Sequence, residues 1–170
     1  MSIKPSTKVP ALSLPMVAGG QFELAKSAPR TFTLLVAYRG LHCPICKTYL
    51  RDLDRKLAEF EALGVKAVAA STDTQQRAEQ SKTEWGIEHL PIAYGLGIEQ
   101  ARTWGLFISA GIKDGEPPLF AEPGLFLIRP DQTLYAASIQ TMPFARPSFS
   151  DVLAAVKFVT EKDYPARGEA

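Results

Sequence analysis

Two kinds of hydrophobic periodicity alternate along the chain, and together they predict an α/β fold. Residues 32–38 form a nearly unbroken apolar run of strand length, which is typical of a strand covered on both faces. Residues 44–63 repeat apolar positions at spacings of three and four, which predicts a helix that ends at Gly64. A second apolar run at residues 65–71 and a polar helical stretch at residues 74–85 follow. Strand, helix, strand and helix in succession indicate parallel strands.

Shorter apolar stretches flank this unit on both sides. Residues 11–14 and 21–24, joined across a Gly-Gly turn, predict an N-terminal hairpin. Residues 123–128 and 133–139 predict a second, antiparallel hairpin, and residues 149–159 predict the last amphipathic helix. The other expectations are a helix cap at 71–73, an extended piece at 89–94, a short helix at 97–104, a turn-rich stretch at 111–118 and a polar tail at 163–170.

Length and composition are those of an ordinary globular protein. We expect one domain spanning residues 1–170, because 170 residues lie within the usual size of a single domain. Nineteen basic and eighteen acidic residues give a formal net charge of +1, which disfavours nucleic acid or an anionic membrane as a partner. The sequence has no apolar window of membrane-span length and no signal-peptide pattern at its start. We therefore expect a cytoplasmic protein.

Both cysteines of the chain, Cys43 and Cys46, form a C-x-x-C motif where the apolar run 32–38 gives way to the helix starting near Pro44. Proline suits the first helical position, since its missing N–H would have had no partner there. The free N–H groups and the dipole of a helix N-terminus stabilise an anion, so a thiolate forms more readily at this place. In a reducing compartment, an isolated C-x-x-C is expected to be a redox couple or a metal site.

Three interpretations of the cysteines compete. They could be small buried core residues, but their position between a strand and a helix speaks against this. A zinc site needs four protein ligands, or three and a water, and the only histidines available beside the thiols are His42 and His89. Thiol redox chemistry, in which one thiolate attacks and the other cysteine resolves the product as a disulfide, is therefore preferred. We expect no metal and no other cofactor.

The order of elements around the motif resembles the thioredoxin fold, which implies a central mixed β-sheet flanked by helices, with an N-terminal hairpin extension. Within that superfamily, residues 9–15, the Tyr38-Arg39-Gly40 lead-in and residues 124–128 resemble the peroxiredoxin-like AhpC/TSA redoxins. This resemblance implies a peroxidase that reduces peroxides to alcohol or water and takes its electrons from a thioredoxin or glutathione system. It also suggests a homodimer, although the sequence leaves the oligomeric state open. A general thiol:disulfide oxidoreductase acting on protein disulfides and a redox-regulated binding module without turnover are the alternatives.

The sequence departs from both family patterns at informative positions. Typical peroxiredoxins have Thr-x-x-Cys with the attacking cysteine second, and an arginine just before the later hairpin; here these places hold Cys43 and Pro123. Thioredoxins instead attack with the first cysteine and have a cis-proline at that hairpin, which Glu122-Pro123 resembles. We therefore predict a cis bond at Pro123 facing the cysteines. The two analogies assign opposite nucleophiles. We prefer Cys43 for disulfide exchange, because the very start of a helix offers more N–H groups and more exposure, so Cys43 should have a lower pKa than Cys46.

Three cations are candidates to support the thiolate. Arg39 precedes the motif directly, and His42, if protonated, adjoins Cys43. Arg146 lies in the loop 140–147, which follows the strand 133–139. That strand should run parallel to the strand leading to the cysteines and end at the same edge of the sheet, which places the loop beside them. For each cation the alternative is a solvated surface charge.

Overall fold

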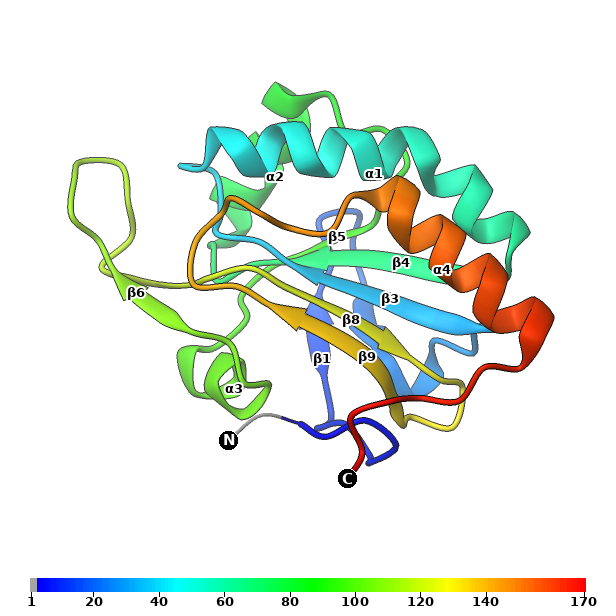
Figure 1. The fold of residues 1–170 in the computed structure, drawn as a ribbon. Coiled ribbons are helices and arrows are strands. Elements are labelled where there is room, and N and C mark those ends of the chain that lie inside the picture. The colour runs from blue at the N-terminus through cyan, green and yellow to red at the C-terminus, as the bar shows by residue number, and fades with distance from the viewer. Residues whose placement is uncertain (1–2) are drawn as a thin grey trace.

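The computed structural model describes residues 3–170, in which a five-stranded sheet lies between two layers of other elements (Figure 1). The strand order is β5-β4-β3-β8-β9. The three strands on one side are parallel, and β8 is antiparallel to both β3 and β9, so the sheet is mixed as expected. The strands are β3 (Phe32–Ala37), β4 (Val65–Ala70), β5 (Ile92–Ala93), β8 (Gly124–Ile128) and β9 (Leu134–Ile139).

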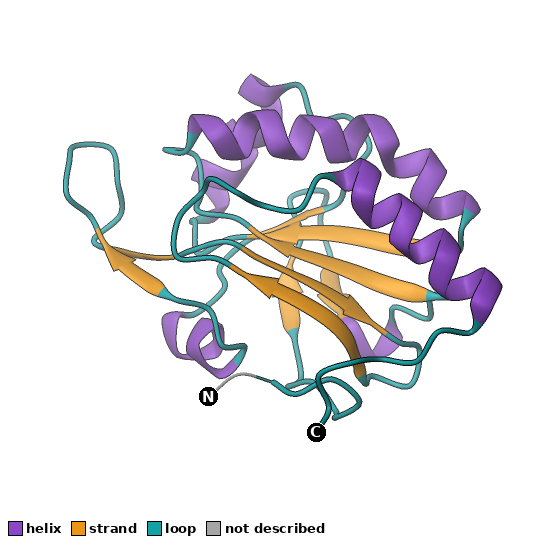
Figure 2. Cartoon of the chain, viewed as in Figure 1, coloured by secondary structure: helices purple, strands orange, loops and turns teal. Residues whose placement is uncertain are grey.

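Helices cover one face of the sheet, and the N-terminal hairpin covers the other (Figure 2). The central strand β3 is buried along its whole length because its side chains alternate between the two layers. Leu34 packs with the helices, and Leu35 packs with the hairpin layer. The helical layer consists of α1 (Pro44–Ala62), α2 (Gln75–Trp85) and α4 (Phe149–Lys162), and the other layer of β1 (Ser13–Pro15), β2 (Gln21–Glu23), the 3₁₀ turn η1 (Leu24–Lys26) and α3 (Ile98–Thr103).

A small hairpin that the sequence pattern missed projects from the body beside the cysteine end of α1 (Figure 1). It pairs β6 (Ile108–Ala110) with β7 (Leu119–Ala121) and carries the turn-rich residues 111–118 at its tip. Each strand has only three residues; β6 is partly exposed, whereas Phe120 and Ala121 of β7 are buried. A strand this short has too few positions to show a regular hydrophobic alternation.

The start of α2 differs from the expected one. The side chain of Thr74, and not the 71–73 segment, caps the helix by accepting the Arg77 N–H at 3.4 Å. Ser71 instead accepts the Asp73 N–H, and the Asp73 carboxylate accepts the Leu41 N–H. The turn between β4 and α2 is thereby attached to the segment that leads into the cysteines.

The polar tail after α4 folds back onto the sheet. Ala166 is buried, and the Tyr135 hydroxyl donates to the Tyr164 carbonyl at 3.1 Å. Apolar content was too low here to indicate this packing. Among the helices of residues 3–170, none has both the length and the hydropathy that crossing a bilayer requires.

Candidate active site

The two cysteines lie at the start of α1, beyond the carboxyl end of β3. Cys43 is the N-cap residue, and its Sγ accepts the backbone N–H of Cys46 at 3.2 Å. Pro44 occupies the first turn, as expected. Both cysteines are free thiols, and they are 1% and 0% exposed. The expectation that Cys43 is better exposed than Cys46 is therefore wrong, because both side chains belong to the apolar cluster beneath α1.

The pKa values of the two thiols are shifted in opposite directions. The hydrogen bond from the Cys46 thiol, the Cys46 backbone N–H and the charges of Arg146 and Arg39 together outweigh burial and lower the pKa of Cys43 to about 6. Burial raises the pKa of Cys46 well above its usual value, and the bond that it donates to Cys43 raises it further. At neutral pH the pair is thus a Cys43 thiolate beside a Cys46 thiol. The predicted order of acidities is confirmed.

Arg146 reaches this pair from the loop after β9. In the sheet Ala37 pairs with Gly124, which pairs with Ile139, so β3 and β9 end at the same edge. The predicted topology is therefore confirmed. Arg146 Nη1 lies 3.6 Å from Cys46 Sγ, and its guanidinium carbon lies 4.1 Å from the ring centre of Tyr49. Because Tyr49 also donates its hydroxyl to the Pro147 carbonyl at 2.6 Å, it attaches the loop to α1.

Arg39, which precedes the cysteines in the chain, is paired with a carboxylate. Its Nε lies 3.2 Å from Glu122 Oε2, and its guanidinium carbon lies 4.8 Å from the ring centre of Phe120. Glu122 is 3% exposed and also accepts the Ser109 hydroxyl at 2.6 Å. Sequence reasoning missed this carboxylate. The available signal was an acidic residue between two apolar strands, where only a partner of opposite charge makes burial tolerable.

Pro123 follows Glu122 at the start of β8, but the bond between them is trans, as is every peptide bond within residues 3–170. The predicted cis bond is therefore wrong. The backbone here lies between two hydrogen bonds: the Glu122 N–H donates to the Phe107 carbonyl, and the Pro123 carbonyl accepts the Gln140 N–H. The trans isomer is also the lower in free energy for an X-Pro bond in general.

His42 is not a cation at neutral pH. Its ring packs on Phe120, with the ring centres 4.5 Å apart. Burial and the nearby Arg39 charge lower its pKa, so it is neutral at pH 7. A neutral His42 does not supply the positive charge that its candidate role beside Cys43 requires. His89, the other histidine, is exposed on the surface, and residues 3–170 contain no cluster of three or more side chains that could ligate a metal ion.

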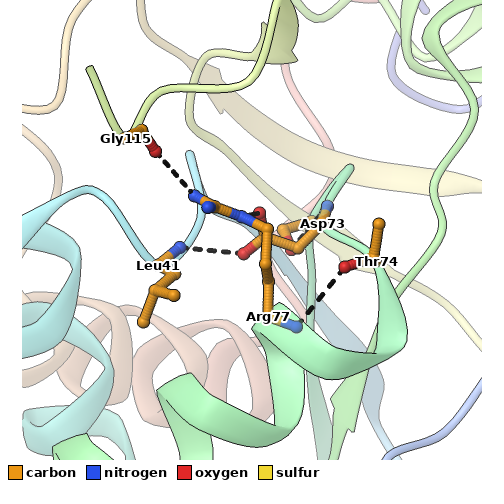
Figure 3. A network of polar contacts seen from close by, with 6 residues as sticks. Leu41, Asp73, Thr74, Arg77 and Gly115 are labelled. Atoms are coloured by element: carbon orange, nitrogen blue, oxygen red, sulfur yellow. Dashed lines mark hydrogen bonds and ion pairs between the residues drawn. The ribbon is translucent and has the colours of Figure 1, made fainter. Parts of the chain in front are cut away.

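A second buried carboxylate, also missed from the sequence, belongs to Asp73 beyond the end of β4. Figure 3 shows it between two partners: it accepts the Leu41 N–H at 2.8 Å and faces Arg77 Nε at 2.9 Å. Arg77 in turn donates to the Gly115 carbonyl, on the tip of the β6–β7 hairpin, at 3.1 Å. This network joins two segments that flank the cysteines, the Gly40–His42 turn and the hairpin tip.

Comparison with known proteins agrees with this geometry. Residues 5–137 match the AhpC/TSA family, whereas the search of curated proteins found no match. Similar solved structures are a mutant of peroxiredoxin 6 from Arenicola marina (TM-score 0.78, 18% identity, 95% of this chain and 76% of that one), peroxidoxin BcpB from Mycobacterium tuberculosis (0.74, 18%, 92% and 98%) and peroxiredoxin Q from Xanthomonas campestris (0.70, 24%, 91% and 97%). The chain belongs to the AhpC/TSA family and is a thiol-dependent oxidoreductase.

Proposed function

We propose that this protein reduces peroxides at the expense of the Cys43–Cys46 dithiol, with Cys43 as the attacking thiolate. The observation that carries the proposal is the position of the Cys43 sulfur. It caps the helix, accepts the Cys46 N–H at 3.2 Å, and has its pKa lowered to about 6. A thiolate that is stable at neutral pH, next to a second thiol, has what the two steps of peroxide reduction need.

In the first step, the Cys43 thiolate attacks one oxygen of the peroxide. A sulfur–oxygen bond forms, the oxygen–oxygen bond breaks, and the electron pair leaves with the alkoxide or hydroxide. Cys46 supplies the proton for this leaving group, since its thiol already donates a hydrogen bond to Cys43. The products are an alcohol or water, a Cys43 sulfenic acid and a Cys46 thiolate.

In the second step, the Cys46 thiolate attacks the Cys43 sulfur and expels hydroxide, which is protonated to water. Arg146 suits this step, because its Nη1 lies 3.6 Å from Cys46 Sγ and stabilises the negative charge there. Two electrons have then passed from two thiols to one peroxide. Reduction of the resulting disulfide requires an external dithiol or two monothiols, and we propose a thioredoxin or glutathione system as this donor.

The opposite assignment, with Cys46 as the attacking residue, has one observation in its favour. Arg146 contacts Cys46 and not Cys43 directly, and the resemblance to peroxiredoxins places the attacking cysteine second. The acidities argue against it, because burial raises the pKa of Cys46 and keeps this residue protonated at neutral pH.

Thiol:disulfide exchange with protein substrates is the second candidate function. The lowered pKa of the first cysteine in a C-x-x-C motif favours it. Burial disfavours it: Cys43 is 1% exposed, so a protein disulfide has no access to Sγ unless the surrounding turn opens. A small peroxide needs much less displacement. We therefore prefer the peroxidase.

The proposal is tested by mass spectrometry of two single variants after peroxide treatment, beside rates for hydrogen peroxide, an organic hydroperoxide and insulin disulfides. Cys46→Ser should accumulate a sulfenic acid at Cys43, trapped with dimedone, whereas Cys43→Ser should yield no such adduct under the same conditions. Both peroxides should oxidise the wild-type protein much faster than a free cysteine. An adduct confined to Cys46, or insulin reduction without peroxide consumption, would replace the proposal by one of its two alternatives.

A further inference from the structure

The Asp73 carboxylate is buried in an unusual place for a charge. Its side chain has no solvent exposure, and in contact with it are Arg77 Nε at 2.9 Å and the Leu41 N–H at 2.8 Å. A buried carboxylate persists only where partners of opposite charge and hydrogen-bond donors replace its water. One of the two partners here is the backbone of the segment leading into Cys43. The carboxylate therefore fixes that segment as well as α2.

Gly40 and Asp73 are fitted to one another. A Cβ at position 40 would lie 2.7 Å from Asp73 Oδ1, and Gly40 has a φ of +129°, a value that side-chain-bearing residues rarely adopt. The carboxylate thus lies against the bare glycine Cα and holds the next N–H, that of Leu41. The Gly40 carbonyl in turn accepts the Cys43 N–H at 3.1 Å. Asp73, Gly40, Leu41 and Cys43 form one continuous set of contacts.

We propose that Asp73 is a positioning residue for Cys43, whose carboxylate holds the Gly40–Leu41 turn and so presents the Cys43 sulfur to the first N–H groups of α1. It acts through the backbone and touches neither sulfur. The inference rests on the proposed role of Cys43 as nucleophile, and it adds a residue that is 30 positions away and on another element.

Removal of the carboxylate has two effects on the pKa of Cys43, and because they have opposite signs, the direction of the shift tests the proposal. Through space, the loss of a negative charge near a thiol lowers the pKa of that thiol, and the Arg77 charge left behind lowers it further. Release of the turn instead removes Cys43 from its hydrogen bond with the Cys46 N–H and raises its pKa toward that of a free cysteine. Arg146, Arg39 and the Cys46 thiol are the other groups that act on Cys43, and the substitution leaves them in place.

The experiment measures iodoacetamide alkylation of Cys43 in the full-length reduced protein between pH 5 and 10, with fragment ions to separate Cys43 from Cys46. In Asp73→Ala the alkylation rate at pH 7 should fall by about tenfold, the result of a pKa rise of roughly two units, and should recover at pH 10, where the Cys43 thiol is ionised in both proteins. Asp73→Asn should lose less than about threefold, because its amide oxygen can still accept the Leu41 N–H. Asp52→Ala is the matched control. It removes a different carboxylate, which lies on α1, and should leave the profile unchanged.

A folded Asp73→Ala protein whose Cys43 profile is unchanged, or is shifted to lower pH, overturns the inference. Should Asp73→Ala fail to fold, the Asp73→Leu/Arg77→Leu double variant replaces the ion pair by two apolar side chains and leaves no unpaired charge, and it should show the same loss at pH 7. An unchanged profile in that variant likewise overturns the inference. A wild-type Cys43 that titrates like a free cysteine would instead refute the proposed nucleophile, so the two failures are distinguishable.

Discussion

Cys43 and Cys46 are the same residue type one helical turn apart, yet their surroundings differ in kind. Cys43 precedes the helix, so its sulfur accepts the N–H of Cys46 and has a lowered pKa. Cys46 lies within the first turn, and burial raises its pKa. Burial is nearly complete for both, so exposure does not distinguish them. What distinguishes them is the direction of the hydrogen bonds between them: Cys43 accepts from the thiol and the backbone N–H of Cys46, which lowers its pKa, whereas donating to Cys43 raises the pKa of Cys46.

The comparison also separates local from distant contributions. The hydrogen bonds that favour the Cys43 thiolate come from within residues 43–46, whereas the cation that contacts Cys46 comes from Arg146, 100 positions along the chain. The start of α1 thus largely stabilises the Cys43 thiolate, whereas a residue brought close by the tertiary fold stabilises the Cys46 thiolate. Substitutions along the chain should therefore affect the two half-reactions separately.

Of all substitutions, replacement of Cys43 should have the largest effect on peroxide consumption. A serine hydroxyl is a far weaker nucleophile than a thiolate, so peroxide consumption by Cys43→Ser should fall about a thousandfold or more. Cys46→Ser should keep a slower first turnover, because it loses the thiol that donates to Cys43 and protonates the leaving group, and it should lose the following turnovers. Single-turnover stopped-flow traces against steady-state rates check both. If Cys46→Ser loses the first turnover and Cys43→Ser keeps it, the two cysteines exchange roles.

The pH dependence should report Cys43 alone. A lowered pKa of about 6 means that the thiolate is present above pH 6 and is lost as the pH falls through that value. The rate of the first step should therefore decrease about 30-fold between pH 7 and pH 4.5, with a midpoint near 6. Stopped-flow measurements across this range test it. A midpoint near 8.5 would mean that the helix start does not stabilise the thiolate.

Arg146→Met should sharpen the comparison by affecting the Cys46 step. Loss of a charge-assisted hydrogen bond of roughly 1.5–3 kcal/mol should slow disulfide formation from the sulfenic acid about tenfold or more. Arg39→Met is the contrasting variant: it leaves the buried Glu122 carboxylate without its cation, so it should cost about 3 kcal/mol of stability. Double-mixing kinetics and urea unfolding separate the two effects. Equal slowing of resolution by both variants would contradict the distinction.

Tyr49→Phe should also affect the Cys46 step, but less than Arg146→Met does. It removes the hydroxyl bond to Pro147 and keeps the ring beneath the Arg146 guanidinium. The expected loss is about 1 kcal/mol of stability and up to about threefold in the rate of disulfide formation. Urea midpoints and the double-mixing assay measure both. Wild-type behaviour in both measurements would show that this bond does not hold the loop.

His42→Phe should have the smallest effect. The neutral imidazole contributes no charge at pH 7, and a phenyl ring can still pack on Phe120. The first-step rate at pH 7 should change by less than about twofold. A tenfold loss would show that a histidine proton takes part in the chemistry after all.

Local patterns predicted the elements that carry the cysteines. The apolar run 32–38 became a central strand, and the helical period after Pro44 became α1 with Cys43 at its cap. The position of the Arg146 loop followed from strand order alone, since alternating strand directions determine which ends meet. In each case the prediction depended on neighbouring residues or on connectivity.

The errors share a different origin. The charge state of His42 depends on Phe120 and Arg39, which surround its ring. The isomer of the Glu122–Pro123 bond depends on the hydrogen bonds on either side of it. Exposure of the first cysteine was likewise misjudged, because the cluster beneath α1 that covers it gathers residues from distant elements.

The sequence by itself determined the α/β order, the C-x-x-C at a helix start and the more acidic first cysteine, because periodicity and the free N–H groups of a helix end act over a few residues. Only the tertiary structure decided that Asp73 holds the turn before Cys43, that Glu122 neutralises Arg39 and that Arg146 faces Cys46. A buried charge is tolerated only where a partner lies within a few ångströms, and which partner that is depends on contacts between residues far apart along the chain.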